Sequence, residues 1–141
     1  IISDEVFADY ALAGCTSGAP GQLAHREDVL GFTLGGLSKT VGLPQVKLGW
    51  IAVSGSGPVL ESALARLELA CDTYLSVSTP VQCAAAELLE RGADVRRQIH
   101  ERVRRNLAAG ERLVAAQPAC RLLTAEGGWY AVLQVPTFMA E

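Results

Sequence analysis

The amino-acid sequence predicts an α/β fold, in which a mixed sheet with flanking helices precedes part of a small α+β unit. Short apolar runs occupy the first third of the chain, and apolar residues at helical spacing dominate the middle. Strand-like patterns return after Pro118. Strands, then helices, then a hairpin behind one long helix indicate that the chain has two parts.

The first part opens with three predicted strands. They are the run "IIS" at 1–3, the segment "VLGFTLGGLSK" at 29–39, and "LGWIAVSG" at 48–55. About eight residues separate Lys39 from the third segment, whereas a parallel crossover needs about a dozen or more. We therefore expect the second and third strands to run antiparallel, which brings Lys39 and Lys47 to the same rim of the sheet.

Two helices are predicted after these strands. The first begins near Ser56 and Pro58 and continues at helical spacing to Tyr74. The second is "STPVQCAAAELLERG", with Thr79 as its candidate N-cap and Gly92 at its end.

A third, longer helix is predicted from about residue 94 to residue 117. One side carries an apolar stripe, and the opposite side carries Arg96, Arg97, Arg104, Arg105 and Arg112. A basic ligand-binding face is one interpretation of these arginines. We favour a solvated face, because Glu101 and Glu111 lie nearby in the sequence.

The last segments predict a hairpin. "CRLLTAE" and "WYAVLQV" flank Gly127 and Gly128, which suit a tight turn. We assign residues 1–92 to part of a large domain, and residues 93–141 to a long linking helix and the start of a small C-terminal domain. Both chain ends lie beside strand-like segments, so we expect the sequence to be a piece of a larger protein.

The composition is typical of a soluble globular protein. The chain has 141 residues, of which 50% are hydrophobic and 19% charged, with a net charge of −3. This length allows one domain with a sizeable core. The weak negative charge does not favour nucleic acid, and no apolar run approaches the roughly 20 residues of a membrane helix. We therefore expect neither nucleic-acid nor membrane partners.

The cysteine and histidine pattern predicts no metal site. The four cysteines lie far apart without a C-x-x-C pair, and His25 and His100 stand alone. Widely spaced cysteines are typical of reduced structural thiols, which favours a cytoplasmic location.

The stretch "GGLSKTVGLPQVKLGW", residues 35–50, carries the candidate chemistry. A solvated surface lysine at position 39 does not explain the glycine pair before it. A phosphate-binding P-loop is also a poor match, because Ser38 replaces the glycine before the lysine and Pro44 interrupts the helix that should follow. We favour a third interpretation, in which the amine of Lys39 forms a Schiff base with a cofactor.

The neighbouring residue types suit a phosphorylated pyridine ring. Gly35 and Gly36 would let the ring and its phosphate approach the backbone. Ser38 offers a hydroxyl and Lys47 a positive charge to the phosphate. Asp4 ends the first strand, at the edge of the sheet where ligands of α/β folds usually bind, and can keep a pyridine nitrogen protonated.

Two of these segments together resemble a known family. "SDEVFADY", followed some thirty residues later by "LSKTVGLPQVKLGWI", is similar to the class I/II pyridoxal-phosphate-dependent aminotransferases of fold type I. "YLSVSTPVQCAAAELL" and "GGWYAVLQV" also resemble later segments of this family, so the resemblance covers essentially the whole chain. It implies a fold type I mixed sheet, with residues 1–92 in the large cofactor-binding domain.

The resemblance also implies roles for individual residues. The cofactor would be pyridoxal 5′-phosphate, with Lys39 as the Schiff-base lysine and proton shuttle, and Asp4 as the partner of the ring nitrogen. Ser38 and Lys47 would bind the phosphate, although many relatives carry arginine at the second position. Phe7 would also belong to the cofactor-binding residues; it stands where many members have a tyrosine whose hydroxyl meets the phenolic oxygen of the cofactor, so that hydroxyl contact is missing here.

By this resemblance the protein is an aminotransferase that moves an amino group between an amino acid and a 2-oxo acid, and works as a homodimer. Other parts of the site in this family lie outside these residues, so we expect the 141-residue chain alone to be nearly inactive. Two alternatives stay open. One is another fold type I enzyme, such as a lyase or decarboxylase. The other is a non-catalytic aminotransferase-like module of a regulator that binds the cofactor as a ligand.

Overall fold

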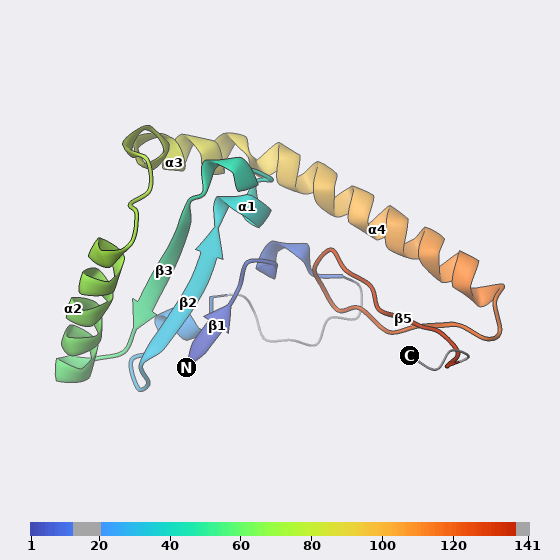
Figure 1. Ribbon diagram of the computed structural model, residues 1–141, viewed down its shortest axis with the longest axis horizontal. Coiled ribbons are helices and arrows are strands. Elements are labelled where there is room, and N and C mark those ends of the chain that lie inside the picture. The colour runs from blue at the N-terminus through green and yellow to red at the C-terminus, as the bar shows by residue number, and fades with distance from the viewer. Residues whose placement is uncertain (13–20, 138–141) are drawn as a thin grey trace.

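A computed structural model describes residues 1–12 and 21–137 of the chain (Figure 1). A three-stranded sheet lies at its centre, α2 lies on the β3 side, and α4 extends from the sheet toward a small second sheet. This arrangement confirms the predicted α/β architecture. The elements are β1 Ile2–Asp4, η1 Ala8–Tyr10, η2 Leu23–His25, β2 Gly31–Gly36, α1 Leu37–Thr40, η3 Pro44–Val46, β3 Gly49–Ser54, α2 Gly57–Thr73, α3 Thr79–Arg91, α4 Ala93–Ala115, β4 Arg121–Leu122 and β5 Leu133–Gln134.

The central sheet is mixed, as predicted. β1 pairs with β2 in parallel, from Ile2 opposite Phe32 to Asp4 opposite Leu34. β2 pairs with β3 antiparallel and ends with Gly36 opposite Gly49. The carboxyl ends of β1 and β2 therefore meet at one edge of the sheet, which is also where β3 begins.

The second strand is shorter than the apolar run that predicted it. It ends at Gly36, and the next four residues form the single helical turn α1. The Leu37 amide donates a hydrogen bond of 3.0 Å to the carbonyl of Leu48, and the Leu37 side chain is fully buried. Lys39 consequently lies in a helical turn beyond the strand.

The glycine pair before α1 has a packing reason. A Cβ atom at Gly35 would lie 2.4 Å from Nε1 of Trp50, its cross-strand partner. A Cβ atom at Gly36 would lie 3.0 Å from the carbonyl oxygen of Leu48. The Trp50 ring needs the space that Gly35 leaves, so this packing alone accounts for one of the two glycines.

The three long helices start and end close to the predicted positions, with one correction. The N-cap of α3 is Ser78, whereas Thr79 takes the first helical position. The amides of Val81 and Gln82 donate to the Ser78 carbonyl at 3.0 and 3.1 Å. Pro80 fits in this first turn because the amide that it lacks would have no partner within the helix.

Gly92 joins α3 to α4 without a loop. Its φ of −73° is ordinary helical backbone, so a left-handed turn does not explain the glycine. A Cβ atom at this position would lie 2.3 Å from Cγ1 of Val41, a buried side chain just after α1. The close approach of the helix joint to Val41 therefore requires glycine.

We expect Gly92→Ala to destabilise the chain by about 1–3 kcal/mol, because the new methyl group overlaps Val41 and forces the helices apart. Urea unfolding measures the effect. Gly110→Ala is the matched control, since this glycine lies in α4 with open space around its Cβ position. The control should stabilise the chain by up to about 1 kcal/mol. Equal unfolding midpoints for the two variants would contradict the packing argument.

The arginines of α4 form a largely solvated face, as predicted. Arg97 is exposed and bonds to Asp94 and Glu101 at 3.2 and 3.1 Å. Arg96 differs, because its guanidinium reaches Asp9 beside η1 at 3.3 Å. This ion pair attaches the start of α4 to the segment that follows β1.

The predicted tight hairpin is wrong in its turn. β4 and β5 are antiparallel, but only Arg121–Gln134 and Leu122–Leu133 form register pairs. Gly127 and Gly128 lie in a longer loop whose backbone bonds to the segment after β1. The Leu12 amide donates to the Glu126 carbonyl at 2.8 Å, and the Gly128 amide to the Tyr10 carbonyl at 3.0 Å. The glycines therefore serve a long-range contact.

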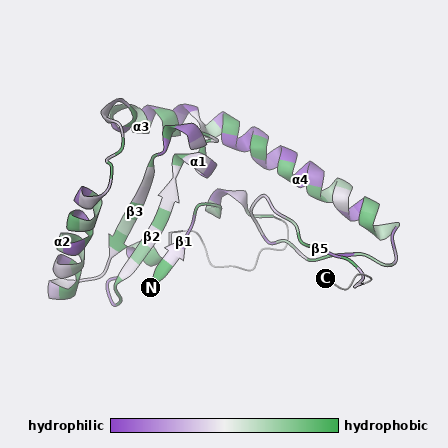
Figure 2. Ribbon diagram, in the orientation of Figure 1, coloured by the Kyte–Doolittle hydropathy of each residue, from purple (hydrophilic) through white to green (hydrophobic). Residues whose placement is uncertain are grey.

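The core is smaller than the chain length predicts. The buried apolar side chains of the described residues are Tyr10, Leu12, Leu37 and Val41. Tyr74 and Leu75, which follow α2, are almost wholly exposed. Apolar and polar residues alternate along α4 (Figure 2), so this helix presents only a stripe to the rest of the chain. None of the described helices combines the length and the apolar character needed to cross a membrane.

The cysteines and histidines stand apart. Cys71, Cys83 and Cys120 are free thiols, although the first two are exposed and do not pack in a core; Cys15 lies outside the described residues. Within residues 1–12 and 21–137, no group of three or more His, Cys, Asp or Glu side chains could hold a metal ion.

Candidate functional site

The predicted site residues come from elements that meet at one edge of the central sheet (Figure 1). Asp4 is the last residue of β1, and Lys39 lies in α1 directly after β2. Lys47 lies two residues before β3, on the antiparallel neighbour. The prediction that Lys39 and Lys47 reach the same rim is confirmed at the level of the backbone.

Lys39 has an amine without a polar partner. Its side chain is half-buried, and within the described part of the chain its Nζ forms no hydrogen bond or ion pair. Nζ lies 5.4 Å from the ring centroid of Trp129 and 6.0 Å from that of Phe7. Both distances are within the range of a cation–π contact.

Tyr10 holds the main chain of Lys39. Its hydroxyl donates a 2.7 Å hydrogen bond to the Lys39 carbonyl, and its side chain is fully buried. Burial raises the pKa of the Tyr10 phenol above its ordinary value, and the negative charge of Asp9 adds to this rise, while Arg96 opposes it. Tyr10 therefore stays protonated and can donate at neutral pH.

Four aromatic side chains pack together beside the turn that carries Lys39. They are Phe7, Tyr10, Trp129 and Tyr130, and we call them the aromatic cluster. Phe7 lies 5.5 Å from Trp129 and 5.8 Å from Tyr130, and Tyr10 lies 5.2 Å from Trp129. All three pairs are edge-to-face, a geometry worth about 0.5–1.5 kcal/mol beyond burial. The ring of Phe7 thus packs against the loop after β4.

His100 attaches α4 to this cluster. Its Nε2 lies 2.8 Å from the carbonyl oxygen of Ala11, and its ring contacts Tyr10 edge-to-face at 5.8 Å. His100 is accordingly a helix-face residue with a structural contact, as predicted.

Two adjacent carboxylates at the end of β1 differ in their contacts. Glu5 accepts hydrogen bonds from the Gly21 amide at 2.7 Å and the Ser3 hydroxyl at 3.2 Å. Asp4 is exposed and accepts only one, from the Val6 amide at 3.2 Å. Its carboxylate has no ion-pair partner among the described residues, so it keeps acceptor capacity for a positively charged group.

Ser38 and Lys47 are near the edge but do not touch each other. Ser38 is half-buried in α1, and Lys47 is exposed at the end of η3. Lys47 is the one non-glycine residue with positive φ in the described chain, at 54°. Such a left-handed residue is uncommon and often marks a functional turn. The structure brings both residues to the rim without joining them to Lys39.

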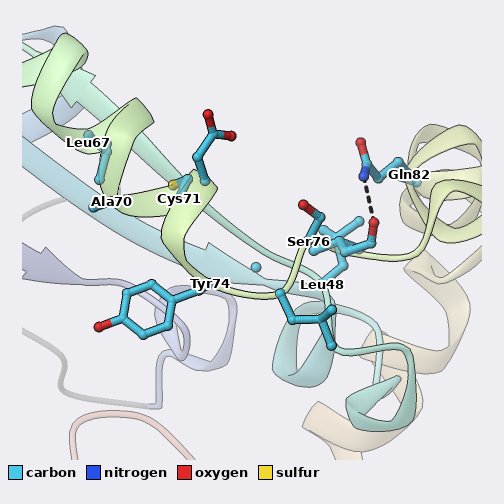
Figure 3. Close-up of a pocket in the computed structure, with 12 residues that line it drawn as sticks. Leu48, Leu67, Ala70, Cys71, Tyr74, Ser76 and Gln82 are labelled. Carbon is cyan, nitrogen blue, oxygen red and sulfur yellow. Dashed lines mark hydrogen bonds between the residues drawn. The ribbon is translucent and has the colours of Figure 1, made fainter.

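A separate cavity of about 710 Å³ lies between the start of β3, the end of α2 and α3 (Figure 3). Leu48, Leu67, Cys71 and Tyr74 line part of it, and the Gln82 amide bonds to the Val77 carbonyl at its rim at 2.7 Å. The lining contains none of the predicted site residues. This cavity is therefore distinct from the predicted site around Lys39.

Comparison with known proteins decides the family. The model of the family described as aminotransferase class I and II matches residues 1–134. The chain belongs to this family. No curated protein matches it. The class I and II aminotransferase match confirms the resemblance that the two motifs indicated, and the mixed α/β structure is consistent with part of a fold type I domain.

Enzymes of the aminotransferase class I and II family typically depend on pyridoxal phosphate. The residues present fit this cofactor. Lys39 offers an amine with no polar partner among residues 1–12 and 21–137, and Asp4 offers a carboxylate on the neighbouring parallel strand. An amine and a carboxylate at one sheet edge are the donor set that an aldehyde and a protonated pyridine nitrogen require.

Sequence patterns missed Tyr10 and Trp129. Tyr10 ends the "SDEVFADY" segment, and Trp129 follows the glycine pair, so each lies inside a quoted motif. Their contact with each other and with Lys39 depends on the loop after β4 folding back to β1. No local periodicity encodes that contact.

Proposed function

We propose that this chain is the lysine-bearing part of an aminotransferase that moves an amino group between an amino acid and a 2-oxo acid. The observation that carries the proposal is the free amine of Lys39 beside the end of β1, where Asp4 lies, in a chain of this family. A P-loop would instead need a helix after the lysine that points its amides at a phosphate. Here the helical turn ends at Thr40.

Four residues would hold the cofactor. Lys39 would bond to it covalently, and Asp4 would pair with its ring nitrogen. Ser38 and Lys47 would contact its phosphate, with Lys47 as a point charge in place of a bidentate arginine. When bound, pyridoxal phosphate supplies an electron sink that acidifies the α-proton of the amino acid.

With the cofactor bound, Lys39 would transfer protons and Asp4 would stabilise positive charge. The Lys39 amine would accept the α-proton of the amino acid at Nζ and return a proton later. The Asp4 carboxylate would favour the protonated pyridine ring. Tyr10 fixes the carbonyl of Lys39, and so the turn from which Nζ works.

We extend the proposal to the organisation of the protein. Residues 1–92 would belong to the large cofactor-binding domain and residues 93–141 to the linking helix and the small domain. The enzyme would be a cytoplasmic homodimer. Exposed apolar side chains such as Tyr74 and Leu75 support the proposal, because a second subunit or the rest of the protein would cover them.

Amino-group transfer tests the proposal directly. The full-length protein, loaded with pyridoxal phosphate, is given amino acids in turn together with a 2-oxo acid. We expect at least one new amino acid to form from the oxo acid. Labelling of Lys39 without any transfer would overturn the aminotransferase assignment, and release of carbon dioxide or ammonia would favour a decarboxylase or lyase.

We expect Asp4→Asn to lower the transfer rate by about 10- to 1000-fold, because an opposite charge changes the pKa of its partner by about 1–3 units. The amide can still accept the hydrogen bond from Val6, so the turn should persist. Steady-state kinetics measures the loss. Asp28→Asn, which removes an exposed carboxylate that pairs with Arg26, is the control and should leave the rate unchanged. Equal rates for both variants would remove Asp4 from the site.

A further inference from the structure

The indole ring of Trp129 reaches the amine of Lys39 from a distant part of the sequence. Trp129 lies in the loop between β4 and β5, whereas Lys39 lies in α1. Nζ is 5.4 Å from the centroid of this ring. Of the aromatic side chains, tryptophan gives the strongest cation–π attraction, and this distance is inside its range of about 6 Å.

The Trp129 ring is held in place by its neighbours. The loop backbone is tied to the segment after β1 by the hydrogen bond from Gly128 to Tyr10. The ring itself packs edge-to-face against Phe7 at 5.5 Å and Tyr10 at 5.2 Å. Its Nε1 is buried and has no hydrogen-bond partner among the described residues, so packing alone sets its orientation.

We propose that Trp129 is a positioning residue for Lys39. The face of its indole ring holds the charged amine of Lys39 at the carboxyl edge of the sheet. Phe7 forms a second wall, with its centroid 6.0 Å from Nζ. Because the Lys39 amine has no polar partner in the described chain, its contacts with these two rings, of which Trp129 is the nearer, are what restrain its side chain. The inference rests on the proposed function only for the chemical role that Lys39 then plays.

The first test uses the cofactor-free chain and its two lysines, Lys39 and Lys47. An amine held against a ring reacts more slowly with an acetylating reagent than a free one. Mass spectrometry gives the ratio of the Lys39 and Lys47 acetylation rates. In Trp129→Leu we expect this ratio to rise about two- to fivefold, the factor that corresponds to an exposed cation–π contact.

Trp50→Leu is the matched control, because it also removes an indole ring, one that packs over Gly35. Its Lys39 to Lys47 ratio should equal that of the parent. A Trp129→Leu chain with parental circular dichroism and an unchanged ratio would overturn the proposal.

A second test keeps the ring and removes the amine, which covers the case in which Trp129→Leu does not fold. Trp50→Phe leaves Trp129 as the single tryptophan. In this background, Lys39→Met should change the emission of Trp129, whereas Lys39→Arg should preserve it. Identical spectra for the methionine variant and its parent would contradict the contact.

These measurements separate the two hypotheses. They need no cofactor, so a failed amino-transfer assay leaves the acetylation ratio and the fluorescence as valid readouts. In the active full-length protein, Trp129→Phe should lower kcat with KM nearly unchanged, because the positioned amine acts after substrate binding. A change in KM alone would assign Trp129 to substrate binding and overturn its positioning role.

Discussion

Replacing Lys39 with methionine is expected to abolish covalent cofactor binding and to lower amino transfer by at least about 10²- to 10⁴-fold, the usual contribution of a positioned acid–base group. Methionine fills a similar volume but has no nitrogen to bond or to accept a proton. In the part of the chain that the structure describes, the half-buried side chain has no polar contacts that the fold would lose. The variant should therefore remain folded.

Borohydride reduction with pyridoxal phosphate, followed by mass spectrometry, shows where the cofactor attaches. The parent protein should carry the label on Lys39, and the Lys39→Met variant should carry none. Lys47→Met is the control, since Lys47 is the other lysine at the same rim. It should keep the label on Lys39 but bind the cofactor more weakly. A label on Lys47 in the parent would show that the cofactor attaches to Lys47, which would overturn the proposal.

Replacing Tyr10 with alanine is expected to have the largest effect on stability, about 3–5 kcal/mol, as for other large buried aromatic residues. Tyr10 is fully buried in a small core, contacts Trp129 and His100, and bonds to the Lys39 carbonyl. Domains are stable by only about 5–15 kcal/mol. The alanine variant is therefore expected to lose a large fraction of its stability, as measured by urea titration.

Tyr10→Phe isolates the hydroxyl group. It keeps the ring contacts and removes the hydrogen bond to Lys39, which should cost about 1 kcal/mol. Losses of equal size for the alanine and phenylalanine variants would show that the ring packing is unimportant.

The raised pKa of the Tyr10 phenol gives a pH dependence with a definite sign. Its neutral form is favoured in the folded chain, so its contribution to stability is complete below the unfolded pKa. That contribution is lost as the pH rises above about 10 toward the folded pKa. The difference in unfolding free energy between the parent and Tyr10→Phe should shrink over this range.

Local patterns predicted the parts of the fold that local physics determines. The short connection between Lys39 and β3 allows only antiparallel pairing, and the structure has it. Helical spacing and proline at a first turn located α2 and α3 to within a residue or two. These features depend on neighbours in sequence, which is why the sequence alone was sufficient.

Contacts between distant segments were not predictable in the same way. The glycine pair at 127–128 has the composition of a tight hairpin turn, yet its backbone bonds to Tyr10 and its neighbours. The loop instead packs Trp129 into the aromatic cluster, and no periodicity within either segment records that contact. The motif around Lys39 could be matched to the family because its residue types follow a fixed order in the sequence, whereas an aromatic wall can come from anywhere in the chain.

The junction between α3 and α4 has a mechanical consequence. Gly92 touches Val41, the residue that follows the turn bearing Lys39, and Arg96 and His100 fasten the same helix to the strand-end segment. A rotation of α4 about Gly92 would therefore displace Val41 and, with it, the helical turn that carries Lys39.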